Sequence, residues 1–409
     1  MMKNAQYSWL ALPLLCSAAL VEAANGWHGP EPFRLERFDG RQFDYNLESF
    51  LQRLSFTEQP ISSGVPLWQQ NGWYGTGGSS RGKEFYVHSL LQQKVRFDAP
   101  LFAGFRHKRS EDLDGWYDRA LFGVGYQART NWDLGVWGDV SGAKEEMDLQ
   151  FEANRYFDDG SYLTAAVVLT DVFYNSKTYS DNRYERNPLT LYLAGAKQFV
   201  DQQLSAFINI NLPTEFNDAT LGQLLQDEQY SAGISWQRSF QGERQLSVQG
   251  QGLYGKRRAD SPLADSDADW QLTRRFAQLN LEWQQPWQQR PTALGLQLNR
   301  LTEYDSRFAD ATQSAESRRE AFAYLRQDRS LNDNWRWRPT LYVGYGTVRG
   351  ELRTNSDEPL EDNGWLAKFS PNLIWQLSQS SGAYLLINPT VKLHNLQFGG
   401  GNIQVFVPF

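Results

Sequence analysis

The sequence is poor in the residues that carry most catalytic and metal chemistry. Its 409 residues include one cysteine and 4 histidines. A single thiol, Cys16, excludes a disulfide within the chain and any metal site built from several cysteines. The histidines His28, His88, His107 and His394 lie in no recognisable catalytic motif, such as a Gly-x-Ser-x-Gly nucleophile elbow. We therefore predict that the protein is not an enzyme and uses no cofactor.

Long hydrophobic runs and an excess of basic residues are also missing. Beyond the amino-terminal segment, no stretch approaches the roughly 20 apolar residues that a membrane-spanning helix requires. This excludes a helical membrane protein. The formal net charge is −7, from 40 Lys and Arg against 47 Asp and Glu. A nucleic-acid partner would favour a basic face, so we expect no nucleic acid among the partners.

The acidic residues form no complete metal-binding motif. The stretch Asp112-x-Asp114-Gly115-x-x-Asp118 places oxygen ligands at a spacing similar to that of calcium loops. It does not match the whole calcium-binding loop, and a solvated acidic loop is the favoured interpretation. We predict no metal site.

The first residues have the pattern of a secretory signal peptide. Lys3 precedes an apolar run from Trp9 to Leu20, and Val21-Glu22-Ala23 provides a cleavage site after Ala23. Cys16 then belongs to the apolar core of the signal, and the mature chain has no cysteine. We predict a signal peptide over residues 1–23, a short periplasmic lead over 24–42 and one barrel domain over 43–409.

Aromatic residues are abundant although the mean hydropathy is low. The chain has 15 Trp, 19 Tyr and 24 Phe, which make up 14% of its residues, and its mean hydropathy is −0.59. A transmembrane β-barrel combines these two properties, because lipid-facing apolar residues alternate with polar residues facing the lumen and cancel in any local average.

The last nine residues show this alternation clearly. Ile403, Val405, Val407 and Phe409 fall on one face of an extended strand, since successive side chains point to opposite sides. This stretch resembles the closing strand of bacterial outer-membrane β-barrels, which ends on a phenylalanine read by the barrel-assembly machinery. Pro408 departs from the usual pattern and removes one ladder donor, which a strand end tolerates. The resemblance implies that these four residues form the assembly signal.

From Phe85 onward, alternating stretches are joined by short turns and longer loops in regular succession. Counted back from Phe409, every short turn falls on the periplasmic rim, which is the asymmetry of outer-membrane barrels. About 17 strands follow Phe85, and an even total of about 18 requires Phe43 to Phe56 to supply one strand. If that segment is a helix, about 16 strands is the alternative. The segment Thr57 to Glu84 is interpreted as a loop that folds either inward or outward.

The predicted fold is therefore all-β, a transmembrane antiparallel up-and-down β-barrel. On the late strands, Trp335, Trp337, Pro339, Leu341, Val343 and Tyr345 share the lipid-facing side. The side chains predicted to line the lumen are basic on late strands (Arg326, Arg336, Arg338, Lys368, Lys392 and His394) and acidic on early strands (Asp133, Asp139, Asp148 and Glu152).

A basic arc facing an acidic arc would orient water and dipolar solutes in the pore. The alternative is that these charges simply pair for solubility. The aromatic residues Phe102, Trp137, Tyr156, Phe207, Tyr342 and Tyr384 also point inward on this register. They either fill space or offer stacking surfaces to sugar rings, and filling is favoured.

These patterns indicate a porin-like channel that passes hydrophilic solutes across the outer membrane of a Gram-negative bacterium. The alternatives are an exopolysaccharide-export barrel and a surface receptor or adhesin with a closed lumen. The expected partners are outer-membrane lipid and lipopolysaccharide, the barrel-assembly machinery, and a hydrophilic solute or polysaccharide.

Overall fold

The computed structural model describes residues 71–79, 85–97, 100–112, 115–129, 131–139, 149–169, 183–218, 223–260, 270–307, 312–353, 359–378, 380–393 and 396–409. Within these ranges the chain forms strands and turns but no helix, and so none that is long and apolar enough to cross a membrane. The predicted signal peptide over residues 1–23 and the predicted periplasmic lead over residues 24–42 lie outside the described residues. The segment Phe43 to Phe56 lies outside them as well.

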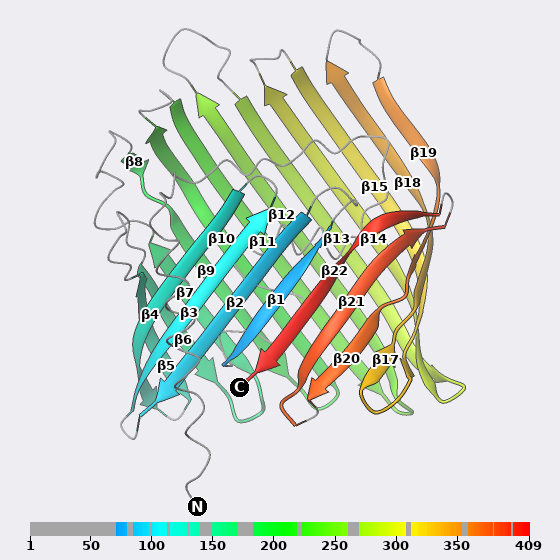
Figure 1. Ribbon diagram of the computed structural model, residues 1–409, viewed down its shortest axis with the longest axis horizontal. Helices are drawn as coiled ribbons and strands as arrows, with labels where there is room; N and C mark the ends of the chain where they lie inside the picture. The colour runs from blue at the N-terminus through cyan, green and yellow to red at the C-terminus, as the bar shows by residue number, and fades with distance from the viewer. Residues whose placement is uncertain are drawn as a thin grey trace, which may run out of the picture.

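The strands are hydrogen-bonded into one sheet (Figure 1). They are β1 (Gly72–Ser79), β2 (Phe85–Arg96), β3 (Leu101–Asp112), β4 (Gly115–Arg129), β5 (Trp132–Asp139), β6 (Leu149–Tyr156), β7 (Tyr162–Leu169), β8 (Arg183–Arg186), β9 (Leu189–Gln198), β10 (Gln202–Asp218), β11 (Gln223–Phe240), β12 (Arg244–Asp260), β13 (Trp270–Trp287), β14 (Arg290–Arg307), β15 (Thr312–Gln327), β16 (Arg329–Ser330), β17 (Trp335–Trp337), β18 (Thr340–Arg353), β19 (Pro359–Ser370), β20 (Leu373–Ser378), β21 (Ala383–Lys392) and β22 (Gln397–Pro408).

The sheet is a closed antiparallel barrel of 18 strands, because four pairs of consecutive segments each form one interrupted strand: β8 with β9, β15 with β16, β17 with β18, and β19 with β20. Pro188, Pro339 and Pro371 lie in three of the four gaps. Proline has no N–H for the ladder and interrupts the pairing there. The predicted fold class and the strand number of about 18 are confirmed.

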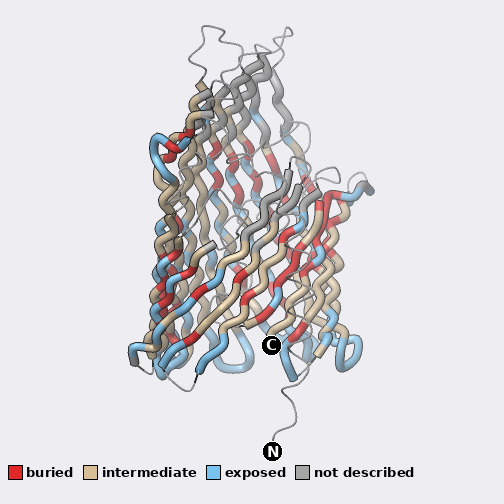
Figure 2. The backbone as a smooth tube through the Cα atoms, turned by 60° about the vertical axis from the view of Figure 1, so that its left-hand side comes forward, coloured by how far each residue is buried: buried red, intermediate tan, exposed pale blue. Residues whose placement is uncertain are grey.

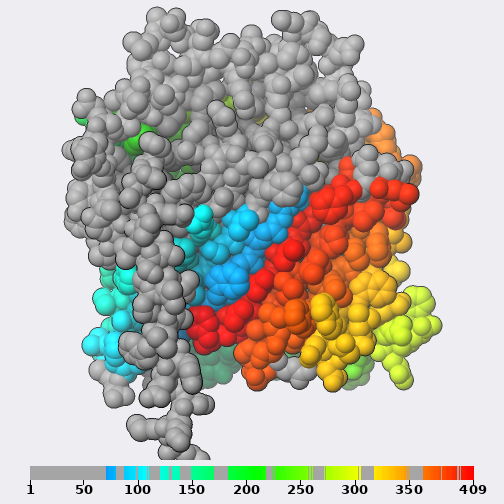
Figure 3. All heavy atoms as spheres, in the orientation of Figure 1, coloured from blue at the N-terminus to red at the C-terminus, as the bar shows by residue number. Residues whose placement is uncertain are grey.

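The barrel closes where β1 pairs with β22, from Gly72 opposite Pro408 to Ser79 opposite Gly401. Figure 3 shows β1 and β22 side by side in one continuous surface. The loop predicted over Thr57 to Glu84 is wrong for Gly72–Ser79, because these residues form β1, a strand of the barrel. Its sequence, GWYGTGGS, has too few side chains to show a period of two.

The strands differ greatly in length, with 8 residues in β1 and 18 in β11. In Figure 1, β10 to β15 extend well above β1, β2 and β22 at the end away from the carboxyl terminus. The polar residues Thr312 to Ser317 are part of β15, and the acidic loop predicted at Asp112 to Asp118 is occupied largely by β3 and β4. Polar residues there continue the strands, because pairing depends on the backbone.

Buried and exposed residues alternate along the strands (Figure 2). On β14, Leu294, Leu296 and Leu298 are 57%, 53% and 48% exposed, while Asn299 and Leu301 beside them are buried. Exposed leucines in a contiguous band are unusual for a surface that faces water. They fit a surface covered by lipid, as in transmembrane barrels, so the fold indicates a bacterial outer-membrane location.

The short turns cluster at the end of the barrel where the carboxyl terminus lies. In the turn between β6 and β7, Gly160 has a φ of 81°, which glycine adopts without strain. Beside it, Lys197 Nζ donates a hydrogen bond to Asp159 Oδ2 at 2.6 Å, and the Ser161 N–H donates to Asp159 Oδ1 at 2.9 Å. These bonds hold the pKa of Asp159 well below its usual range.

Candidate functional site

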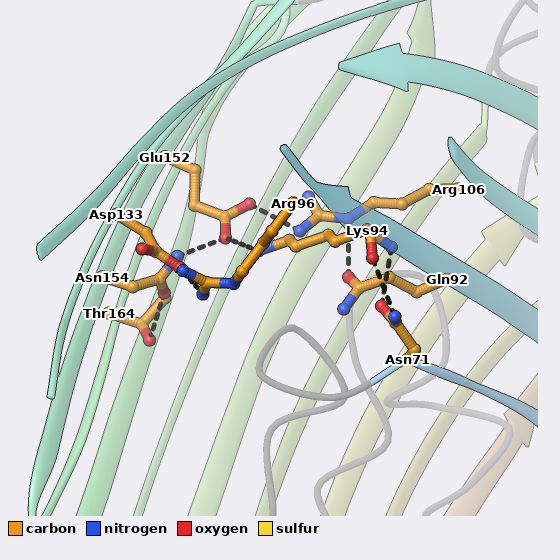
Figure 4. A network of polar contacts seen from close by, with 9 residues as sticks. All are labelled: Asn71, Gln92, Lys94, Arg96, Arg106, Asp133, Glu152, Asn154 and Thr164. Atoms are coloured by element: carbon orange, nitrogen blue, oxygen red, sulfur yellow. Dashed lines mark hydrogen bonds and ion pairs between the residues drawn. The ribbon is translucent and has the colours of Figure 1, made fainter. Parts of the chain in front are cut away.

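Side chains from several early strands form a polar network on the inner wall (Figure 4). At its centre is Glu152 of β6, whose side chain is 1% exposed. Its carboxylate lies 2.7 Å from Arg106 Nη2 of β3 and 3.3 Å from Lys94 Nζ of β2, and it accepts a hydrogen bond from Asn154 Nδ2. One buried carboxylate thereby joins β2, β3 and β6. Such a group is tolerated only because cations and donors satisfy it.

A second ion pair lies beside the first. Arg96 Nη2 of β2 is 2.8 Å from Asp133 Oδ2 of β5. Asp133 is 1% exposed, whereas the Arg96 side chain is 51% exposed. At the edge of the network, Asn71 Nδ2 donates to the Lys94 carbonyl oxygen and Asn71 Oδ1 accepts from the Lys94 N–H. These bonds attach the start of β1 to the end of β2.

Two aromatic rings, Phe102 and Trp137, pack against the cations of this network. Trp137 of β5 is fully buried and lies across Gly104 and Gly123, where a Cβ atom would overlap its indole. A Cβ at Gly125 would likewise overlap Phe102. The Arg106 guanidinium carbon lies 3.8 Å from the Trp137 ring centroid, so the charge stacks on the indole face.

Aromatic rings pack over glycines at further places around the barrel. Each ring lies directly opposite a glycine on the neighbouring strand, and a Cβ at that glycine would overlap the ring. The pairs are Trp137 with Gly123, Phe102 with Gly125, Phe207 with Gly233, Tyr324 with Gly295, and Phe322 with Gly344. Glycine lets a ring from the next strand lie along the wall, an arrangement also used to stabilise glycine in sheets.

A second charged cluster lies on the late strands. Glu282 of β13 is 2.6 Å from Arg326 Nη2 and accepts a hydrogen bond from Tyr324 Oη at 2.8 Å. Further along the wall, Lys368 of β19 and Lys392 of β21 are directly opposite and both buried. Lys368 Nζ lies 4.4 Å from the centroid of the Phe322 ring.

Two residues of the predicted acidic arc, Asp133 and Glu152, form ion pairs with basic side chains. Asp133 of β5 and Glu152 of β6 contact Lys94, Arg96 and Arg106, which come from β2 and β3 and not from the strands paired with β5 and β6. A transverse field between the early and late strands is therefore reduced locally, and the alternative of charges in pairs describes this wall better.

The other predicted lumen residues are more scattered. Arg338 pairs with Asp328 at 3.0 Å beyond the end of β17, and Arg336 of β17 is exposed. The side chain of Asp139, at the end of β5, and the whole of Asp148 and His394 lie outside the described residues. Among the residues that are described, no group of His, Cys, Asp or Glu is arranged to hold a metal ion.

The sequence interpretation missed Lys94, Arg96 and Arg106. Gln92, Lys94 and Arg96 recur at every second position of β2, while Val95 lies between two of them and Phe97 follows directly. This alternation could have identified the inward cations. The glycines under the rings have no such signal, because their role appears only when neighbouring strands are in register.

The proposed assembly residues lie on the outer face of β22. Ile403 and Phe409 are exposed, whereas Asn402 and Gln404 on the other face are buried. The Phe409 N–H donates to the Asn71 carbonyl oxygen at 3.2 Å, next to the closing pair of strands. Val405 and Val407 share this outer face by alternation.

Known protein families and curated proteins show no match to the chain. The solved structures that match it include bacterial outer-membrane β-barrels. The outer membrane protein opdK from Pseudomonas aeruginosa matches with a TM-score of 0.39 and 9% identity over 83% of this chain and 98% of its own. CdiB from Acinetobacter baumannii matches with a TM-score of 0.38 and 9% identity over 84% of this chain; the match spans 61% of CdiB. The translocator domain of the autotransporter NalP from Neisseria meningitidis matches with a TM-score of 0.30 and 11% identity over 88% and 95%.

Proposed function

We propose that the protein is a channel for hydrophilic solutes in the outer membrane of a Gram-negative bacterium. The observation that carries this proposal is the contrast between the two faces of the barrel. The outer face is a band of exposed apolar side chains, whereas polar side chains lie buried on the inner faces of strands around the barrel. They include His88, Gln92, Gln150, Asn154, Thr164, Asn209, Asn299, Asn388, Asn402 and Gln404.

A polar inner wall offers hydrogen bonds that replace part of the hydration shell of a small hydrophilic solute. An apolar solute cannot form these hydrogen bonds. The ion pairs of Glu152 and Asp133 leave the early wall close to neutral. Lys368 of β19 and Lys392 of β21 add positive charge to the wall formed by the late strands. Charges near a narrow passage attract opposite ions within about one Debye length, roughly 10 Å at 0.1 M salt. A weak preference for anions follows.

Current measurements in planar lipid bilayers test this function. The purified protein should give steady conductance steps, and Lys368→Gln/Lys392→Gln should shift the reversal potential toward cation selectivity. Arg244→Gln/Arg290→Gln is the matched control, because both arginines lie at the exposed short-turn end. Unchanged selectivity in the first variant would exclude these lysines from the conducting path. Absence of conductance from the folded protein would refute the channel and favour a closed receptor or adhesin.

Polysaccharide export is the alternative that a specific observation supports. Phe207 and Tyr342 are half-buried aromatic residues on the inner wall, and Phe207 lies along the wall opposite Gly233. A ring in this position can stack on a sugar ring. If a polysaccharide is the cargo, adding it to one side should interrupt the current, and Phe207→Ala should shorten the interruptions.

A further inference from the structure

Four arginines lie on the outer surface of adjacent strands, at one level of the barrel. Arg275 of β13, Arg300 of β14, Arg319 of β15 and Arg349 of β18 are all exposed. We call them the arginine row. Arg300 and Arg319 are directly opposite in the register. Arg275 is diagonal to Arg300, and Arg319 is diagonal to Arg349. Diagonal neighbours on one face of a sheet are roughly 7–8 Å apart, within reach of long side chains.

Burial of the flanking residues establishes that the row faces outward. The residues on either side of each central arginine are buried: Arg274 and Phe276 beside Arg275, Asn299 and Leu301 beside Arg300, and Arg318 and Glu320 beside Arg319. Side chains alternate between the two faces of a strand. The arginines therefore share a face with Leu294, Leu296 and Leu298, which form the exposed apolar band.

The row lies at the edge of the apolar band away from the short turns. On β14 the leucines end at Leu298, and the next outward residue is Arg300. On β15, Ala321 and Ala323 precede Leu325 toward the short turn, with Arg319 on the other side. In the orientation with short turns toward the periplasm, this edge lies at the level of the outer-leaflet head groups.

The charge of the row is not balanced on its own strands. The outward positions between Thr273 and Ala277, between Leu298 and Tyr304, and between Ser317 and Ala321 carry no acidic residue. Glu361 is opposite Arg349 in the register, so the positive charge is centred on β13 to β15. Like charges directly opposite on a sheet are destabilising, and the pair of Arg300 and Arg319 is such a case. A bound anion would remove this repulsion.

The chemistry of the row fits a phosphate group carried by a sugar. Arginine presents a planar fork of donors that binds phosphate in a bidentate manner. Thr302 and Ser317, directly opposite each other, are the next outward pair beyond Arg300 and Arg319. Their hydroxyl groups can donate to phosphate or sugar oxygens. The apolar band below provides a surface for acyl chains.

We propose that the arginine row binds the phosphate groups of the phosphorylated glycolipid of the outer leaflet, lipopolysaccharide. The acyl chains of the lipid pack on the leucines of β14 and its phosphates contact Arg300 and Arg319, with Arg275 as a further contact. This site rests on the outer-membrane location of the barrel and is independent of conduction through its lumen.

Binding of purified lipopolysaccharide to the folded protein in detergent tests the site. Arg300→Gln/Arg319→Gln should weaken binding about tenfold or more, since one charge-assisted contact corresponds to roughly that factor. Arg244→Gln/Arg290→Gln removes two exposed arginines from the opposite end of the barrel and should bind like the unmodified protein. Far-ultraviolet circular dichroism and heat-modifiable migration establish that each variant is folded.

A second arm uses lipopolysaccharide from which the phosphates have been removed. The unmodified protein should bind this lipid about as weakly as Arg300→Gln/Arg319→Gln binds the phosphorylated form. Equal affinity of the unmodified protein for both lipids, or equal affinity of both proteins for the phosphorylated lipid, would overturn the proposal. Conductance of Arg300→Gln/Arg319→Gln should be unchanged, so this result separates failure of the lipid site from failure of the channel.

Discussion

Trp137 lies directly opposite Gly123 on the adjacent strand, and its indole occupies the space that a side chain at Gly123 would need. The glycine therefore determines where the ring lies. The ring in turn carries the Arg106 guanidinium on its face, so the position of a charged group on the inner wall depends on a residue that has no side chain.

Gly123→Ala should destabilise the barrel by about 1–3 kcal/mol, because the new methyl group forces the buried indole away from the wall. Urea unfolding in detergent micelles, followed by tryptophan fluorescence, measures this change. Gly255→Ala is the control, since a Cβ at Gly255 meets no atom within 4 Å. Equal losses in the two variants would show that the ring is free to move.

Glu152→Gln should cost about 3–5 kcal/mol, because it leaves the buried cations Lys94 and Arg106 without their shared carboxylate. The same unfolding assay applies, with Glu243→Gln in an exposed turn as the control. Adding Arg106→Gln to Glu152→Gln should recover part of the loss, as expected for interacting residues. Strict additivity would mean that the two side chains do not interact.

The orientation of the barrel predicts which positions a membrane-impermeant thiol reagent reaches in intact cells. A cysteine at Ser314, near the long-strand end of β15, should be labelled, and one at Asp333, in a short turn, should not. Labelling after cell disruption controls for reactivity. The reverse pattern would invert the barrel and place the arginine row at the periplasmic leaflet.

Phe409→Asp should lower the amount of protein assembled in the outer membrane, if the outer face of β22 carries the assembly signal. The carboxylate replaces an exposed ring in the lipid-facing row. Phe398→Asp makes the same chemical change at an exposed phenylalanine near the other end of β22 and should assemble better. Membrane fractionation measures both, and equal amounts of the two variants would remove the basis for a special role of Phe409.

The contact between Asp159 and Lys197 predicts a pH dependence of stability. The pKa of Asp159 is lowered in the folded protein, so its contribution is present above the unfolded pKa of about 4 and is lost as the pH falls through the lower folded value. Asp159→Asn should therefore be less stable than the unmodified protein at about pH 6, and the difference should shrink below about pH 4. Asp158→Asn serves as the control. A difference that grows on acidification would contradict the sign.

The alternation of side chains predicted the fold well, because the lipid and the interior impose opposite polarity on successive residues. It failed at β1, where Gly72, Gly75, Gly77 and Gly78 leave little to alternate. It also gives no signal at the start of β15, since Thr312 to Ser317 pair through their backbone although their side chains are polar.

The site was harder to predict than the fold. Alternation assigns a residue to a face, and the inward positions of Asp133 and Glu152 were expected on that basis. It does not say which charges on other strands lie within contact distance, because that depends on the stagger of the strands and on the curvature of the barrel wall. The contacts of Glu152 with Lys94 and Arg106 join β6 to β2 and β3, with which it does not pair. They depend on how the closed wall brings these strands together, which side-chain patterns in one sequence do not contain.

The difference in strand length has a mechanical consequence. The pair that closes the barrel is limited by the 8 residues of β1, whereas β13 and β14 pair over 18 residues each. A force applied to the carboxyl terminus acts directly on β22, whose pairing with β1 is limited to 8 residues. Under tension the wall should therefore tear first between β22 and β1, and the long strands on the far side should peel away later and at higher force.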